Sequence, residues 1–241
     1  MAERLFRGGG RAALLAFALA PCLALALLSA CGKGGTEERL SDSTGLDAKD
    51  LKRGVKPEPD AEAAVLETTY GRIVLELYPN LAPRMVERFK TLAREGFYDG
   101  TAFHRVSPQV IQGGDPNSKD ADPSNDGAGE SPYPDLPAEF SDVPFERGVV
   151  GAARLGARPA FAGSQGLTEE QARNTANCQF YITMRPMPQW DGEYTVFGRV
   201  IEGMSNADVI AGAPTRPGRP ESPEEKIIIK SVTLQPRSNF K

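Results

Sequence analysis

The sequence predicts a mainly β fold in which short antiparallel strands close into a barrel. Short apolar stretches follow one another after residue 100, and loops rich in Gly, Pro, Asp and Asn separate them. Few segments carry a helical period, and strands do not alternate regularly with helices as they do in α/β proteins. The stretches read TAFHRV, QVIQGG, RGVVGAA, CQFYITM, YTVFGRVI and KIIIKSVTL.

The chain before these stretches predicts a hairpin followed by one helix. VLETT and RIVLELY flank a turn at Tyr70-Gly71 and alternate apolar with charged or small residues, as half-buried strands do. A helical period follows, with Pro83 in the first turn and Gly96 after the last. The apolar positions of this helix are Met85, Phe89, Leu92 and Ala93.

A second helix and two long loops complete the predicted organisation. The segment from Met204 to Ala211 is amphipathic. One loop covers residues 115–142 and is acidic, and the other covers residues 156–176. In the second loop, Thr168 and Gln171 have the spacing of a capping box for one helical turn. Loops of this length in a compact domain are usually functional or disordered.

Composition points to one globular domain and argues against nucleic acid as a partner. Of the 241 residues, 40% are hydrophobic and 25% are charged, which is ordinary for a soluble fold. The net charge is -4 and no basic stripe is visible, whereas nucleic-acid-binding domains usually carry one.

The first thirty residues have the layout of an export signal. Three arginines precede an apolar run over residues 12–30, which ends in the sequence LSAC at Cys31. This end resembles the lipobox of bacterial lipoproteins, in which the signal is cut before a cysteine that is then acylated. We therefore expect a lipid anchor such as palmitate on Cys31 and a location in the cell envelope, facing the periplasm or the exterior. A retained membrane-spanning helix and an ordinary secreted protein are the alternatives.

Residue counts leave little room for metal or cysteine chemistry. The chain has one histidine, and a zinc site needs several converging ligands. Residues 122–127 match the first half of a calcium-binding loop, but Tyr133 occupies the position of the final glutamate. Once Cys22 leaves with the signal and Cys31 is acylated, Cys178 is the one free thiol, which we expect to be packed rather than reactive. No nucleophile-elbow pattern accompanies the histidine, and we expect neither metal nor cofactor.

Four motifs in order carry a family resemblance. FHRV, QGGDP, CQFYIT and DGEYTVFGRVIEGM resemble the cyclophilin family of peptidyl-prolyl cis-trans isomerases, over about Val65 to Leu234. The resemblance implies an eight-stranded antiparallel barrel, closed and capped by two helices, and a monomer that acts on proline-containing polypeptides. We thus expect a signal peptide over 1–30, the acylated cysteine and a flexible tether over 31–61, the isomerase domain over 62–236 and a tail over 237–241.

The resemblance also assigns the chemistry. Arg105 matches the family's catalytic arginine, and Gln112 matches the glutamine that orients this arginine and the substrate carbonyl. Rotation about an X-Pro bond breaks amide resonance, with a barrier of roughly 18–20 kcal/mol. A guanidinium that hydrogen-bonds the prolyl nitrogen stabilises the twisted amide more than the planar one, which is what catalysis requires. The clients we expect are exported or envelope proteins.

Further residues match the family's substrate groove. Tyr181 matches the floor of the proline pocket and Trp190 its wall, His104 is expected to support the rim, and strand alternation turns Phe180 into the core. Gln189 replaces a tryptophan that some members use for cyclosporin, so we expect weaker cyclosporin binding. The full set of substrate-binding candidates is His104, Val110, Ala153, Arg154, Gln179, Phe180, Tyr181, Gln189, Trp190 and Tyr194.

Departures from the family pattern keep a second function open. The segment between Pro108 and Gln112 is one residue shorter than usual and leaves Gln109, Val110 and Ile111 where a phenylalanine would normally cap the proline pocket. Arg154 replaces a common asparagine, and the 156–176 insertion enters where the groove is lined. The alternative function is a weakly catalytic or non-catalytic chaperone or scaffold that binds prolyl peptides.

Overall fold

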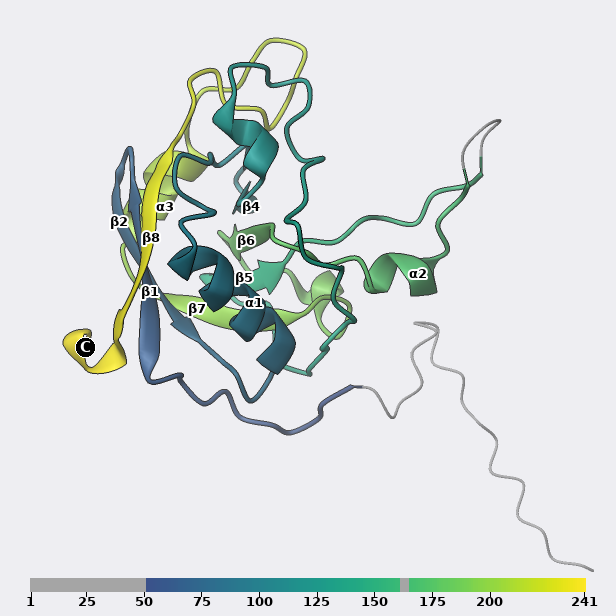
Figure 1. The fold of residues 1–241 in the computed structure, drawn as a ribbon, viewed down its shortest axis with the longest axis vertical. Coiled ribbons are helices and arrows are strands. Elements are labelled where there is room, and N and C mark those ends of the chain that lie inside the picture. Colours follow the sequence, from purple (N-terminus) through teal and green to yellow (C-terminus); the bar gives the residue numbers. More distant parts are fainter. Residues whose placement is uncertain (1–50, 161–164) are drawn as a thin grey trace, which may run out of the picture. The chain divides into compact units, whose positions relative to one another are not determined.

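The computed structural model describes residues 51–160 and 165–241. The predicted signal peptide, Cys31 and most of the predicted tether lie outside the described residues. Figure 1 shows the elements. The strands are β1 (Glu62–Thr68), β2 (Gly71–Leu77), β3 (Arg105–Val106), β4 (Val110–Gly113), β5 (Val149–Ala152), β6 (Phe180–Thr183), β7 (Val196–Glu202) and β8 (Ile229–Pro236). The helices are α1 (Pro83–Arg94), α2 (Glu169–Arg173) and α3 (Met204–Ala211), with 3-10 turns η1 (Pro116–Lys119), η2 (Pro188–Trp190) and η3 (Arg237–Asn239).

The eight strands form one antiparallel sheet that stays open. Their order is β3-β4-β6-β5-β7-β2-β1-β8, so β3 and β8 are the edges. The prediction of eight antiparallel strands is confirmed, but the prediction of a closed barrel is wrong. β3 is two residues long and too short for a ladder with β8. The edges are linked instead by an isolated bridge between Ala102 and Ile228 and by the Phe103 N–H, which donates to Ile227 O at 2.9 Å.

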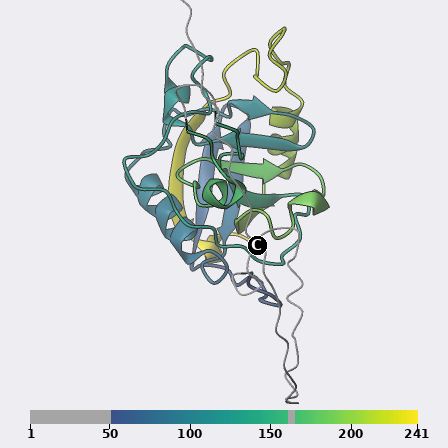
Figure 2. The same cartoon turned by 90° about the vertical axis from the view of Figure 1, so that its right-hand side faces the viewer.

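The predicted hairpin and helices form where their local signals place them. β1 pairs with β2 around Gly71, whose φ of 104° is one that L-residues with a Cβ avoid. α1 begins at Pro83 and buries the predicted apolar positions in the main core, where the Phe89 ring lies 5.1–5.5 Å from the rings of Tyr98, Phe180 and Phe197. α1 packs against β8, whereas α3 packs against β2 and β4; Figure 2 shows the two helices on opposite sides of the strands.

The structure contains a third helix, and residues that were predicted as tether and tail make defined contacts with the domain. α2 is a third helix, five residues long, and Thr168 and Gln171 make both bonds of its capping box, as predicted. Lys52, in the predicted tether, donates through Nζ to Leu81 O at 2.7 Å. At the other end, Arg237 pairs with Glu76 at 2.7 Å. No helix within the described ranges is long and apolar enough to cross a membrane.

Candidate active site

Arg105 and Gln112 lie side by side on two short paired strands. Their Cα atoms are partners in the β3–β4 ladder, and a tight turn joins the strands. In this turn the Ser107 N–H donates to Val110 O at 2.9 Å, and the Ser107 hydroxyl accepts from the Val110 N–H at 3.2 Å. The shortened segment after Pro108 therefore forms a compact connection that holds both side chains at one edge of the sheet.

The two side chains have different partners. Arg105 donates from Nε to Glu221 Oε2 at 2.8 Å and from Nη2 to Oε1 at 3.3 Å. Gln112 donates from Nε2 to Gln179 Oε1 at 3.0 Å. In the described part of the chain, the group that fixes the Arg105 guanidinium is thus Glu221, whereas the sequence had given this role to Gln112. With 43% of its side chain exposed, the guanidinium remains accessible.

Gln179 ties the acidic loop to the site. Its amide donates to Gly127 O at 3.1 Å and to Gly129 O at 3.0 Å. The loop is closed on itself by the buried Asp115, which accepts from the backbone N–H of Asn117 and of Gly127. The 115–142 loop therefore forms one wall of the site.

His104 faces this wall as a buried neutral residue. It is 8% exposed, and its Nδ1 has no hydrogen-bond partner in the described chain. Burial lowers the pKa of His104 below its usual 6.5, because desolvation disfavours the imidazolium; Asp115 opposes this shift. A neutral, buried imidazole agrees with a supporting role for His104.

Two cavities adjoin Gln112. One has a volume of about 360 Å³ and lies beside Arg105. It is lined by His104, Arg105, Gln112, Pro123, Asp126, Gly127, Arg219, Pro220, Glu221 and Ser222. The other has a volume of about 80 Å³ and lies between Gln112, Gln179, Ala153 and Arg154. A bound chain that crosses Gln112 would contact both.

An aromatic cluster occupies the predicted proline pocket. Tyr181 is 4% exposed and is covered by Trp190 and Tyr194, whose ring centroids lie 5.3 and 6.0 Å from its own. Val110 is buried in the same cluster. Phe145, which sequence reasoning missed, stacks on Tyr181 at 6.2 Å. The sequence VPFERGVV gives no sign that Phe145, rather than the neighbouring valines, supports the pocket.

The remaining candidates divide between the rim and the core. Ala153 lies against the cluster, and its N–H donates to Gln179 O at 3.0 Å. Gln189 is exposed at the rim, with Nε2 3.8 Å from Met187 Sδ. Phe180 was among the substrate-binding candidates, but it is fully buried and packs edge-on against Phe89 in the main core. Strand alternation places it on the face opposite the site.

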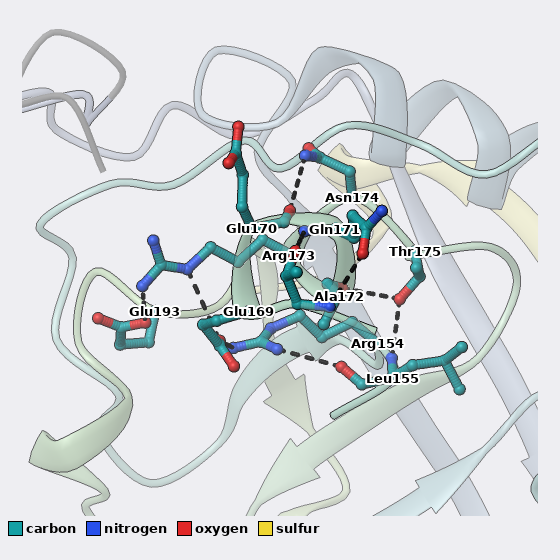
Figure 3. A network of polar contacts seen from close by, with 11 residues as sticks. Arg154, Leu155, Glu169, Glu170, Gln171, Ala172, Arg173, Asn174, Thr175 and Glu193 are labelled. Carbon is teal, nitrogen blue, oxygen red and sulfur yellow. Dashed lines mark hydrogen bonds and ion pairs between the residues drawn. The ribbon is translucent and has the colours of Figure 1, made fainter. Parts of the chain in front are cut away.

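Arg154 belongs to a network of ion pairs that joins the insertion to the rim, as Figure 3 shows. Its guanidinium lies 4.4 Å over the Tyr194 ring and pairs with Glu169 of α2 at 2.8 Å. Arg173 of α2 pairs with Glu193 at 2.9 Å and lies 3.7 Å from Glu169. The Arg154 and Arg173 side chains are 7% and 5% exposed, so α2 is fastened by two nearly buried charges.

The described residues were also compared with what a metal site or a reactive cysteine requires. Within residues 51–160 and 165–241, no three His, Cys, Asp or Glu side chains gather in a way that could hold a metal ion. Cys178 is fully buried, and burial raises the pKa of its thiol to about 12. It is therefore a protonated core residue at neutral pH, as predicted.

The chain is similar to known proteins of one family. Residues 63–234 match the family described as cyclophilin type peptidyl-prolyl cis-trans isomerase/CLD. A probable peptidyl-prolyl cis-trans isomerase of Brucella suis is 41% identical over 174 residues, which cover 70% of this chain and 80% of the relative. A peptidyl-prolyl cis-trans isomerase of Schizosaccharomyces pombe is 42% identical over 142 residues, 58% of this chain and 79% of the relative. A cyclophilin type isomerase of Cryptosporidium parvum, crystallised in the presence of the dipeptide Ala-Pro, superposes with a TM-score of 0.58 at 26% identity, over 72% of this chain and 98% of that chain.

Proposed function

Because the chain belongs to the cyclophilin-type peptidyl-prolyl cis-trans isomerases, we propose that it isomerises X-Pro bonds by stabilising the twisted amide with Arg105. Its relatives support an isomerase as the enzyme class. The reaction makes and breaks no covalent bond, and it needs a group that hydrogen-bonds the prolyl nitrogen once twisting has localised its lone pair.

The observation that carries the proposal is the setting of Arg105. Its guanidinium is accessible, is held by a two-point contact, and lies beside Gln112 at the mouth of a cavity. Gln112 is in turn the ladder partner of Tyr181, which lies in the aromatic cluster. A peptide along this edge places its proline ring against the cluster and its prolyl nitrogen toward Arg105.

The test is an isomerisation assay on a short X-Pro peptide with Arg105→Ala and Arg105→Lys. We expect Arg105→Ala to lower kcat/KM by roughly 100-fold or more, as loss of a preorganised donor does elsewhere. Lysine keeps the charge but loses the planar fork, so Arg105→Lys should recover only part of the rate. Arg158→Ala, which removes an exposed arginine with no ion pair in the described chain, is the control. An Arg105→Ala variant as fast as the wild type would refute the mechanism.

A binding module is the second candidate, and one observation favours it. Trp190 and Tyr194 cover Tyr181, so a proline ring must displace one of them to reach the pocket floor. A protein that binds prolyl peptides on this rim without twisting them would act as a holdase or scaffold. Peptide affinity measured together with the isomerisation rate separates the two, because a scaffold binds without acceleration.

We also propose that the domain works in the cell envelope on exported proteins, tethered through lipid on Cys31. The lipobox-like sequence supports this proposal. Cells grown with an alkyne analogue of palmitate should label the wild type and leave it in the membrane fraction. The Cys31→Ser variant should lose both the label and the membrane association, whereas Cys22→Ser should keep them. Label on Cys31→Ser would contradict the anchor.

A further inference from the structure

Glu221 contacts β3 through both its side chain and its backbone. Its carboxylate forms the two-point contact with Arg105 Nε and Nη2, at 2.8 and 3.3 Å. Its carbonyl accepts from the Val106 N–H at 2.7 Å. One residue from the 213–227 loop thus fixes both residues of a strand that has only two. The two side chains are 43% and 39% exposed, so the two-point geometry and the added backbone hydrogen bond are what distinguish this contact from an ordinary surface ion pair.

The backbone of Glu221 is held in an unfavourable conformation. Its φ is 73°, and among the residues that the structure describes it is the one non-glycine residue with a positive φ. A Cβ makes this region costly, and residues held there cluster at functional sites. The loop is closed around it by an isolated bridge between Thr215 and Pro223 and by the Arg216 N–H, which donates to Ser222 O at 2.8 Å. The loop therefore imposes the conformation that aims the carboxylate at Arg105.

The contact leaves the Nη1 end of the guanidinium without a hydrogen-bond partner among the described residues. Arginine has five N–H donors in a fixed plane, and Glu221 takes donors from the Nε and Nη2 edge. The Nη1 donors remain for a substrate. A long arginine side chain loses considerable rotamer freedom when it is fixed, and a group fixed before the substrate arrives loses none at the moment of reaction.

We propose that Glu221 is a positioning residue that orients the guanidinium of Arg105 toward the prolyl bond. The inference rests on the proposed role of Arg105. It adds a residue that lies 116 positions away in sequence and that none of the predicted motifs contains. The opposite role is a latch that neutralises Arg105 and slows the enzyme. The two roles predict opposite changes in rate, because removal of a latch accelerates the reaction.

The experiment compares Glu221→Gln with Glu225→Gln by NMR line-shape analysis of an X-Pro peptide, which gives affinity and turnover separately. Glutamine keeps the shape of the side chain but points an amide at the guanidinium. We expect Glu221→Gln to lower kcat roughly 5- to 10-fold and to change KM by less than about twofold, since orientation acts in the twisted state. Glu225 lies on the same loop, is exposed and has no ion pair in the described residues, so Glu225→Gln should match the wild type.

Three further measurements test whether Glu221 acts through Arg105 and not through the stability of its loop. In the Arg105→Ala background, Glu221→Gln should change the remaining rate by less than about twofold, because coupled residues are not additive. The Arg105 Nε–H resonance should lose its protection from solvent exchange in Glu221→Gln but not in Glu225→Gln. Glu221→Gly relieves the backbone conformation, so it should keep the wild-type unfolding midpoint or raise it and still lose rate.

The outcomes separate this inference from the proposed function. A wild type that does not accelerate isomerisation, or an Arg105→Ala variant with full activity, overturns the proposed function and this inference with it. If the wild-type rate depends on Arg105 but Glu221→Gln is as fast as the wild type or faster, only the role of Glu221 is overturned. The role of Glu221 is also overturned if Glu221→Gln lowers the rate by the same factor in the wild type and in Arg105→Ala.

Discussion

His104 is a buried imidazole beside the site, and its burial makes folding stability depend on pH. Desolvation lowers its folded-state pKa below the unfolded value of about 6.5, so the unfolded chain takes up the proton first as pH falls. Its contribution is fully present above pH 6.5 and is lost as pH falls from there through the folded-state pKa. A single proton gives a slope of at most about 1.4 kcal/mol per pH unit.

The measurement is urea unfolding of the wild type and of His104→Gln between pH 7.5 and 5. Carboxyl groups titrate in both proteins and cancel in the comparison. The wild type should lose stability more steeply than His104→Gln below pH 6.5, whatever their absolute stabilities. Parallel curves would mean that the pKa of His104 is the same in the folded and unfolded states, and would contradict the shift.

Gly151 is a residue whose lack of a side chain makes room for the pocket. A Cβ on Gly151, which faces Tyr181 across the β5–β6 ladder, would overlap the Tyr181 phenol ring. Gly151→Ala should therefore force the ring out of place and lower the free energy of unfolding by roughly 1–3 kcal/mol. Gly156→Ala, where a Cβ meets nothing within 4 Å, should change it by less than about 0.5 kcal/mol. Chemical denaturation tests this, and equal midpoints for Gly151→Ala and the wild type would refute it.

At the scale of elements, the helix α2 is too short to be stable by itself and depends on the ion pairs of its charged side chains. Isolated helices of five residues are not stable in water, so the capping box and the ion pairs of Arg173 must hold it. Arg173→Met keeps the apolar stem but leaves Glu193 without its partner. We expect amide hydrogen exchange over residues 169–173 to accelerate by roughly 10-fold or more. Arg158→Met, elsewhere in the insertion, is the control; unchanged exchange in Arg173→Met would show that the ion pairs do not hold α2.

Elements with local signals could be predicted from the sequence, and contacts between distant segments could not. Proline at the start of α1, the Tyr70-Gly71 turn and the Thr168 capping box each act within a few residues. The sequence around Glu221 does not indicate that its carboxylate accepts hydrogen bonds from Arg105, because PESPEE resembles any other acidic loop segment. Phe145 was missed for the same reason, since its role depends on Tyr181 from another strand.

At the scale of the whole molecule, the same limit explains the error about the barrel. Closure requires β3 and β8 to pair, and the sequence shows two apolar segments without showing that β3 ends after two residues. The open edge coincides with the candidate site. The β3–β4 end of the sheet carries Arg105 and Gln112, and the loop that carries Glu221 reaches this end instead of a strand. The candidate site therefore lies at the end of the sheet that stays open.

The central claim is that this edge twists X-Pro bonds rather than only binding them. Two-dimensional exchange NMR on one X-Pro peptide measures cis and trans interconversion directly, and titration of the same sample measures binding. We expect the wild type to bind the peptide and to bring exchange, which takes tens of seconds or more without a catalyst, into the sub-second range. Arg105→Ala should bind within a few-fold of the wild type and lose the exchange. Binding by the wild type without faster exchange would contradict the account and identify a scaffold.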